Sequence, residues 1–165
     1  MPPVNLAANP RMTATTPPGL PAAPAGANIL IVDDNEQIGE MLVDLFQHHG
    51  FNVRVAHNGR WALAHLALLP ADLVITDIFM PDCDGLELLR QLQRLKPRPR
   101  VVAMSGGKDT LMPDILKIAR LMGAEGAIKK PFETAQLLQL VRGLLGDPAS
   151  VRLPRPAASS GPDAP

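Results

Sequence analysis

Ile29-Leu30-Ile31-Val32-Asp33-Asp34 is the stretch of sequence that decides the fold. An uninterrupted run of large apolar residues suits a strand that is buried on both faces, as the strands of a parallel sheet are. Leu73-Val74-Ile75-Thr76-Asp77 repeats the pattern, and again the strand-like run ends in an aspartate. Since both faces of such strands must be covered, the two stretches predict an α/β protein with helices on either side of a parallel sheet.

The segments around these strands alternate between helix-like and strand-like patterns. An amphipathic helix with one apolar stripe in the core is predicted by the spacing of five apolar residues, which are Ile38, Met41, Leu42, Leu45 and Phe46. Similar patterns predict further strands over 51–56, 101–104 and 126–128, and helices over 61–69, 86–95, 109–122 and 137–144. Five strand–helix units in succession indicate a doubly wound five-stranded parallel sheet, which binds ligands beyond the carboxyl ends of its strands.

Reactive side chains follow four of the predicted strands. Asp33-Asp34 and Asp77 end two of them, Ser105 ends another, and Lys130 follows the last. Carboxylates that lie close together repel one another unless a cation joins them, and a set of oxygen ligands suits Mg²⁺ better than zinc or copper. A metal-bound carboxylate with an ammonium and a hydroxyl beside it suits phosphoryl transfer, with an aspartate oxygen as the nucleophile.

Taken together, these residues resemble the response-regulator receiver domain of bacterial two-component signalling. The resemblance spans roughly residues 27–146, and it implies a flavodoxin-like fold with strand order 2-1-3-4-5. Each matching element is weak alone, but their order along the chain is specific. The elements are Asp33-Asp34, Asp77-Ile78-Phe79-Met80-Pro81 followed by Asp84-Gly85, Ser105, and Lys130-Pro131-Phe132.

The resemblance implies that Asp77 accepts a phosphoryl group. The donor would be a phosphohistidine of a histidine kinase or of a histidine phosphotransfer protein. Ser105 would donate a hydrogen bond to the phosphoryl group, and Lys130 would pair with it. The family commonly has a cis peptide bond between this lysine and the following proline, which would aim the lysine at the site.

The resemblance also implies a magnesium site. Asp34 would bind Mg²⁺ directly, and Asp33 would assist through water or from a second layer of ligands. Asp77 and the backbone carbonyl of Phe79 would supply further oxygen ligands.

Two positions depart from the family pattern. Ala127 stands where many receivers carry an aromatic switch residue, so output is expected to depend on backbone shifts of the loop at Ser105. Phe79 is bulkier than the polar residues often found there. We hypothesise that its ring shields the acyl phosphate and slows its hydrolysis.

Composition divides the chain into a central domain and two tails. Residues 1–26 and 147–165 hold 12 of the 18 prolines and none of the five aromatic residues. This composition predicts disordered tails around one domain over 27–146. We therefore expect a stand-alone receiver that signals through contact with a downstream protein or by phosphorelay, and that is not an enzyme.

Charge, cysteine content and hydropathy exclude several other classes of protein. The chain has 16 basic and 16 acidic residues, so it lacks the basic excess of a protein that binds DNA directly. A single cysteine cannot form an internal disulfide, and no apolar run approaches the roughly 20 residues that span a bilayer. A cytoplasmic protein is expected, as a monomer or a weak homodimer.

Some alternatives remain open at this stage. Asp33-Asp34 could be a helix N-cap pair, although Asn35 could also serve as the cap. Trp61 is expected to be partly buried rather than a platform for a ligand. The functional alternatives are a phosphorylation-independent receiver-fold adaptor and an aspartate-nucleophile phosphatase of the haloacid-dehalogenase type, although Asp33 and Asp34 lack the spacing residue of that family's motif.

Overall fold

A computed structural model describes residues 26–80, 85–106 and 114–146 of the chain. Its five strands form one parallel sheet with the order β2-β1-β3-β4-β5. The strands are β1 (Asn28–Val32), β2 (Asn52–Ala56), β3 (Leu73–Asp77), β4 (Arg100–Ser105) and β5 (Gly126–Lys129). The predicted doubly wound sheet and its strand order are therefore confirmed.

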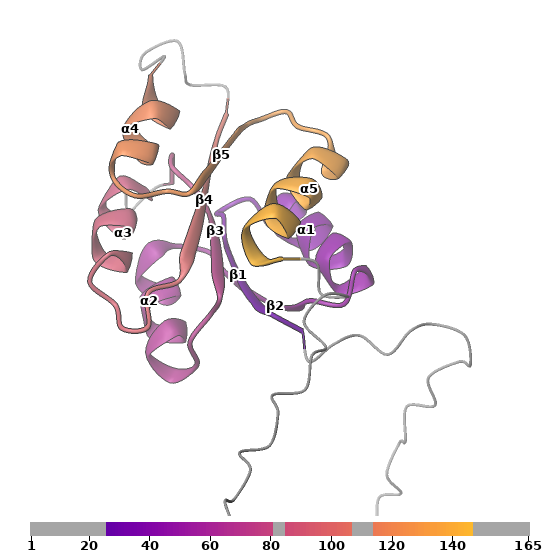
Figure 1. The fold of residues 1–165 in the computed structure, drawn as a ribbon, viewed down its shortest axis with the longest axis horizontal. Coiled ribbons are helices and arrows are strands. Elements are labelled where there is room, and N and C mark those ends of the chain that lie inside the picture. The colour runs from indigo at the N-terminus through magenta and orange to yellow at the C-terminus, as the bar shows by residue number, and fades with distance from the viewer. Residues whose placement is uncertain (1–25, 81–84, 107–113, 147–165) are drawn as a thin grey trace, which may run out of the picture.

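Helices cover both faces of the sheet, as the apolar strands require (Figure 1). On one face lie α1 (Glu36–His48) and α5 (Thr134–Leu145). On the other face lie α2 (Gly59–Leu68), α3 (Gly85–Leu92) and α4 (Ile115–Leu121). A helix follows each strand, so the carboxyl ends of all five strands meet at one edge of the sheet.

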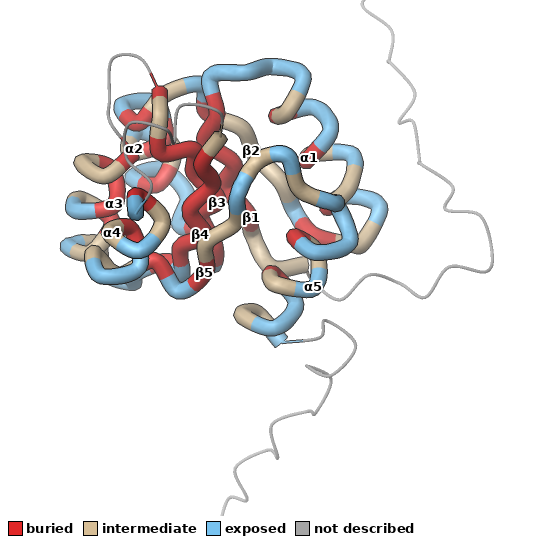
Figure 2. Tube along the Cα trace, turned by 90° about the horizontal axis from the view of Figure 1, so that it is seen from above, coloured by how far each residue is buried: buried red, intermediate tan, exposed pale blue. Residues whose placement is uncertain are grey.

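Side chains of the central strands point alternately to the two faces of the sheet and pack into two separate hydrophobic cores. In β1, Ile29 and Ile31 pack with α1 and α5, while Leu30 and Val32 pack with the opposite helical layer. All four side chains are fully buried, and Figure 2 shows the central strands as the buried middle of the molecule. Burial on both faces is the reason that these strands read as continuous apolar runs in the sequence.

Three apolar residues that the sequence patterns place partly or wholly in the core are exposed instead. Met41 is 41% exposed, Trp61 60% and Leu69 50%. Met41 and Trp61 each lie one residue before a fully buried side chain, and a rotation of 100° per residue turns them onto the flank of the helix. Leu69 lies beyond the last residue of α2, in extended conformation.

Several predicted boundaries shift in the structure or lie outside its described residues. The helix predicted over 109–122 is described only as α4, because residues 107–113 lie outside the described part of the chain. The predicted tails lie outside it as well, except for Gly26. Within the described ranges, every helix is too short or too polar to span a lipid bilayer.

Candidate functional site

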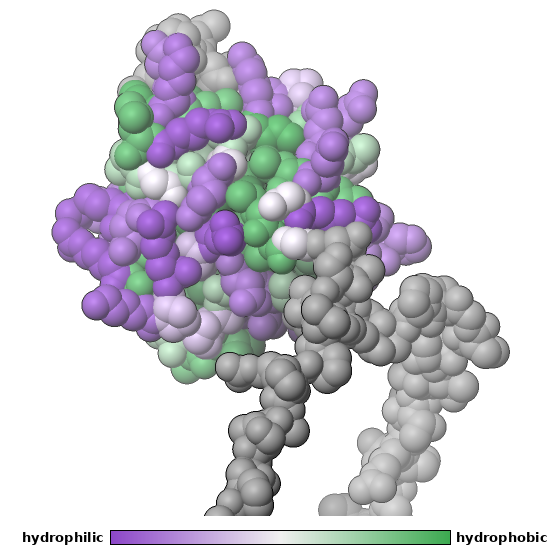
Figure 3. Space-filling view, viewed as in Figure 1, coloured by the Kyte–Doolittle hydropathy of each residue, from purple (hydrophilic) through white to green (hydrophobic). Residues whose placement is uncertain are grey.

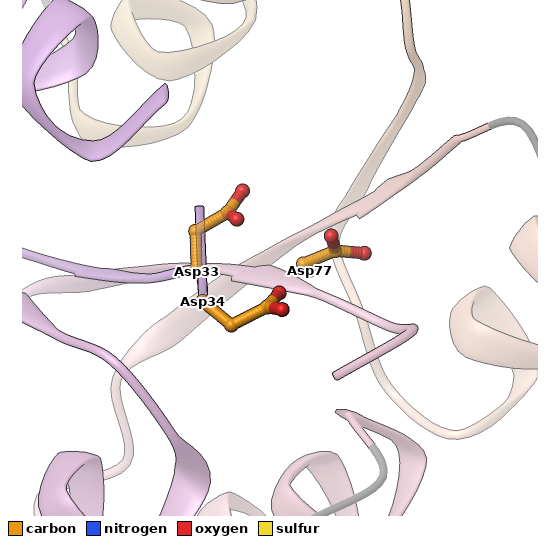
Figure 4. A group of neighbouring side chains, drawn as sticks. All are labelled: Asp33, Asp34 and Asp77. Atoms are coloured by element: carbon orange, nitrogen blue, oxygen red, sulfur yellow. The ribbon is translucent and has the colours of Figure 1, made fainter. Parts of the chain in front are cut away.

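Three aspartates meet at the carboxyl edge of the sheet. Asp77 is the last residue of β3, and Asp33 and Asp34 directly follow β1, which pairs with β3. One ligand atom from each of the three carboxylates lies within 4.8 Å of the others. Asp33 and Asp77 are buried and Asp34 is exposed, and Figure 4 shows all three side chains gathered at this edge.

The N-cap of α1 is Asn35 rather than either aspartate. The Asn35 side-chain oxygen accepts hydrogen bonds from the backbone N–H groups of Gln37 and Ile38. The Asn35 N–H donates to Asp33 Oδ1 at 2.9 Å, which orients that carboxylate. Because Asn35 satisfies the first turn of the helix, both aspartates are left for the site.

Lys130 joins two of the carboxylates although 97 and 53 residues separate it from them in the sequence. Its ammonium Nζ lies 2.7 Å from Asp33 Oδ2 and 2.8 Å from Asp77 Oδ2. The Lys130–Pro131 peptide bond is cis, as the family resemblance implies. The backbone N–H of Lys130 donates to the Ser105 carbonyl, and this hydrogen bond anchors the lysine to the end of β4.

The protonation of this cluster reflects a balance between burial and pairing. Burial raises the pKa of Asp33 by more than the Lys130 ammonium and the Asn35 N–H lower it. Burial alone would lower the pKa of Lys130, but hydrogen bonds and charge attraction from Asp33 and Asp77 outweigh it, so the pKa of Lys130 is raised. Lys130 therefore stays charged and serves as the counter-ion of the two buried carboxylates.

Backbone contacts hold the predicted acceptor, Asp77, in position. The Phe79 N–H donates to Asp77 Oδ1 at 3.0 Å, and the Thr76 hydroxyl donates to the Asp77 carbonyl at 2.9 Å. The Ile78 N–H donates to the Met104 carbonyl of β4, which extends the sheet bonding past the acceptor. Sequence reasoning missed Thr76, because a threonine within an apolar strand carries no signal of such a role.

Ser105 lies at the end of β4, the strand beside β3, and it is fully buried. In the register of β4 with β5, Ser105 is opposite Lys129, so Lys130 is the next residue along. The structure thus places Asp33, Asp34, Asp77, Ser105 and Lys130 at one edge of the sheet.

The Phe79 side chain is half-buried and packs against the core beneath α2, α3 and α4. Pro81 and Asp84 lie outside the described residues.

Gly85 brings the start of α3 into direct contact with the backbone of the acceptor. A Cβ at this position would overlap the Asp77 carbonyl oxygen and would lie 2.5 Å from Ile78 Cα. The Gly85 N–H donates to the Ile78 carbonyl at 2.9 Å. No side chain fits here without a shift of the backbone that carries Asp77.

Replacement of Gly85 by alanine is therefore expected to lower both stability and acceptor function. The methyl group meets backbone atoms, so we expect a loss of about 1–3 kcal/mol in the free energy of unfolding. Urea denaturation measures that loss. Gly143→Ala is the matched control, because a Cβ there meets nothing within 4 Å. An equal loss in the two variants would contradict this account.

The donor set of this edge fits a divalent cation. Hard oxygen ligands from clustered carboxylates are the ligands that Mg²⁺ prefers, and the exposed Asp34 leaves the site open to water molecules that Mg²⁺ usually retains. Among the residues that the structure describes, this cluster holds carboxylates and none of the sulfur or imidazole ligands that zinc and copper favour.

A doubly wound sheet with an acidic cluster and a lysine at its carboxyl edge is the arrangement that the resemblance to receiver domains implies. The family model of the response regulator receiver domain matches residues 29–142 of the chain. The chain therefore belongs to this family, whose members act in two-component systems. The match covers both core layers and every residue of the edge cluster.

Two curated relatives give a measure of the similarity. The chain is 32% identical over 117 residues to the transcriptional regulatory protein CpxR of Klebsiella pneumoniae. The aligned region covers 71% of this chain and 48% of that protein. It is 34% identical over 119 residues to the transcriptional regulatory protein YkoG of Bacillus subtilis, which covers 72% of this chain and 50% of the other. The chain thus matches about half the length of these relatives.

Solved structures of receivers share the fold over nearly their whole length. The chemotaxis protein CheY4 of Vibrio cholerae aligns with a TM-score of 0.65 and 28% identity, over 73% of this chain and 99% of that one. The receiver domain of NtrX from Brucella abortus aligns with a TM-score of 0.65 and 29% identity, over 71% and 97%.

Proposed function

We propose that the protein is a response regulator whose Asp77 accepts a phosphoryl group from a histidine kinase or a histidine phosphotransfer protein. The observation that carries the proposal is the clamp of Lys130 on Asp33 and Asp77 beside the exposed carboxylate of Asp34. This cluster offers a nucleophile, a cation for the phosphoryl oxygens and a set of metal ligands within one small volume.

The proposed step transfers the phosphoryl group from nitrogen to oxygen. A carboxylate oxygen of Asp77 attacks the phosphorus of a phosphohistidine, a new P–O bond forms and the P–N bond breaks. The histidine of the donor leaves as an imidazole and takes up a proton. Lys130 donates hydrogen bonds to the phosphoryl oxygens, and the Phe79 N–H, already on Asp77 Oδ1, holds the carboxylate in its orientation.

Asp33, Asp34, Asp77 and the Phe79 carbonyl would hold Mg²⁺. When bound, the metal ion would neutralise the charge that gathers on the carboxylates and the phosphoryl oxygens. Asp33 is oriented for this role by the Asn35 N–H, and Asp34 lies open to solvent.

Output would follow from a change in the partners of Lys130. Phosphorylation adds negative charge at Asp77, and the Lys130 ammonium would exchange its contact with the Asp77 carboxylate for one with a phosphoryl oxygen. A switch from mostly off to mostly on requires a differential of ~5.5 kcal/mol. Charged hydrogen bonds to Lys130 and Ser105, at roughly 1.5–3 kcal/mol each, supply a large share of it. Since the Lys130 N–H is bonded to the Ser105 carbonyl, the shift would reach the ends of β4 and β5.

The location, the partners and the output of the receiver are proposed as well. We propose a cytoplasmic receiver that contacts a downstream protein or relays the phosphoryl group, and that neither binds DNA directly nor acts as an enzyme. The zero net charge of the chain supports the absence of direct DNA binding. Ala127 in place of an aromatic switch residue supports an output that depends on the Ser105 loop.

Incubation with acetyl phosphate and Mg²⁺, followed by intact mass spectrometry, tests the proposal. We expect the mass of one phosphoryl group to be gained with Mg²⁺ and not after chelation with EDTA. A folded protein that gains no mass would instead favour a phosphorylation-independent adaptor. Sustained turnover of a generic phosphomonoester would favour the phosphatase alternative.

Replacement of Phe79 by asparagine is expected to shorten the lifetime of the phosphorylated form. The half-buried ring lies two residues from the acceptor, and the smaller polar side chain would admit water to the acyl phosphate. Loss of the phosphoryl mass over time after removal of the donor measures the half-life. An unchanged half-life in a variant that is phosphorylated normally would rule out the shielding hypothesis.

A further inference from the structure

The outer surface of α2 carries apolar side chains and no carboxylate. Trp61 is 60% exposed, Leu68 86% and Leu69 50%, and Ala64 is exposed between them. The exposed face of a surface helix is ordinarily polar, because its apolar stripe is turned to the core. In α2 the outer face is apolar apart from the exposed Arg60, while Ala62 and Leu66 fill the side toward the sheet.

Both ends of α2 are held firmly, so the exposed stripe is a preorganised surface. The Asn58 side chain accepts from the Trp61 N–H and caps the first turn. At the other end, the Arg54 guanidinium donates to the carbonyls of His65 at 3.2 Å and Leu69 at 2.7 Å. These bonds satisfy groups at the helix ends that would otherwise require water, and a rigid surface loses little entropy when it binds.

Within the described residues, nothing covers this stripe. α2 packs over β2, which is an edge strand that pairs with β1 alone. No strand of the sheet therefore lies beyond α2 on that side. Figure 3, in the view of Figure 1, shows hydrophobic atoms at the lower end of the domain, where α2 lies.

We propose that the α2 stripe binds a second copy of the chain through an antiparallel, two-fold contact of α2 with α2. The stripe has a large side chain in its first turn and another in its last, about 10 Å apart along the axis, with a small residue between them. In an antiparallel pair, Trp61 lies against Leu68 of the partner subunit, and Ala64 lies near the two-fold axis, where the helices approach most closely. Arg60 of each copy lies at the opposite end from its counterpart, so the arrangement avoids repulsion between the two cations.

The size of the stripe indicates how strong this contact is. The exposed parts of Trp61, Leu68 and Leu69 with the neighbouring alanines amount to roughly 400 Å² per copy, on the scale of one to two large side chains each burying 150–250 Å². Two copies would bury roughly 800 Å² in total, below the roughly 1,200 Å² of a stable interface. The dimer is therefore weak and forms at high protein concentration.

Sedimentation of the full chain, between about 20 µM and about 1 mM, tests the dimer in the range where small interfaces become populated. We expect the wild type to associate as concentration rises, and Leu68→Lys to weaken association about tenfold or more, since it places a charge in an apolar contact. Leu121→Lys on α4 is the matched control, because Leu121 is equally exposed at 87% and lies outside the stripe. The proposal is overturned if the wild type stays monomeric throughout, or if Leu121→Lys abolishes association and Leu68→Lys does not.

Cysteine cross-linking tests the orientation of the helices. In a Cys83→Ser background, which removes the single native cysteine, Ala64→Cys is expected to form a disulfide-linked dimer under mild oxidation. Arg60→Cys is the matched control, because antiparallel helices hold its two copies at opposite ends. Cross-linking at position 60 in preference to position 64 would overturn the antiparallel arrangement.

Discussion

Replacement of Asp77 by asparagine is expected to abolish phosphoryl incorporation completely. The amide has nearly the shape of the carboxylate and can still accept the bond from the Phe79 N–H, but it is not a nucleophile toward phosphorus. Intact mass spectrometry after incubation with acetyl phosphate and Mg²⁺ should show the added phosphoryl mass in the wild type and none in the variant.

The matched control for this substitution is Asp44→Asn, an exposed position on α1 that lies outside the edge cluster. It should gain the same mass as the wild type. Urea denaturation of the Asp77 variant establishes that it is folded. If the folded Asp77 variant still gained one phosphoryl group, the acceptor would be another residue and the proposed function of this site would fail.

Replacement of Lys130 by methionine is expected to give the largest loss of stability among the site variants. The ammonium lies between two buried carboxylates, and its removal leaves Asp33 and Asp77 to repel each other without a counter-ion. We expect a loss of about 3 kcal/mol in the free energy of unfolding at pH 7, at the lower end of the range for a broken buried ion pair. Lys117→Met is the matched control, because the Lys117–Asp114 pair is exposed and contributes little.

The pH dependence of this loss has a definite sign. Burial already holds the pKa of Asp33 above its ordinary value, and without the ammonium this pKa would rise further. A carboxyl group with a raised pKa in the folded state takes up a proton more readily there than in the unfolded chain, so folding is favoured as the pH falls through the folded-state pKa. The deficit of the Lys130 variant should therefore shrink below pH 7.

Mg²⁺ should reduce the same deficit by a different route. A divalent cation replaces the missing positive charge, so Mg²⁺ should stabilise the Lys130→Met variant more than the wild type. Thermal denaturation with Mg²⁺ and with EDTA measures the difference. Equal stabilisation of the two proteins would show that Lys130 and the metal ion do not share the same carboxylates.

The predictable part of the fold and of the site came from local patterns. Runs such as 29–32 and 73–76 are apolar because each strand is covered on both faces, and this condition is visible without knowledge of the neighbours. The aspartates stand directly after the runs, and topology alone brings the carboxyl ends of parallel strands to one edge. The family resemblance added the role of each residue and the strand order.

Exposure of the helix flanks was the part that local patterns described poorly. Helical spacing shows that an apolar side chain lies near the apolar stripe, but it does not show whether that side chain is covered. Ala62 is buried and the preceding Trp61 is exposed, although the two are adjacent in the sequence. Which flank is covered depends on the neighbouring elements, and α2 lies at the edge of the sheet, where the described part of the chain places no further strand. The exposed stripe that results is the basis of the proposed dimer.

The sequence by itself determined the alternation of strands and helices, the edge at which chemistry would gather and the residues that would gather there. Only the tertiary structure decided how those residues pair. It assigned the cap of α1 to Asn35, joined Lys130 to Asp33 as well as to Asp77, and set Gly85 against the backbone of the acceptor. The physical reason is distance: periodicity and burial are written along the chain, but hydrogen bonds and ion pairs depend on separations of a few ångströms between residues that lie far apart in it.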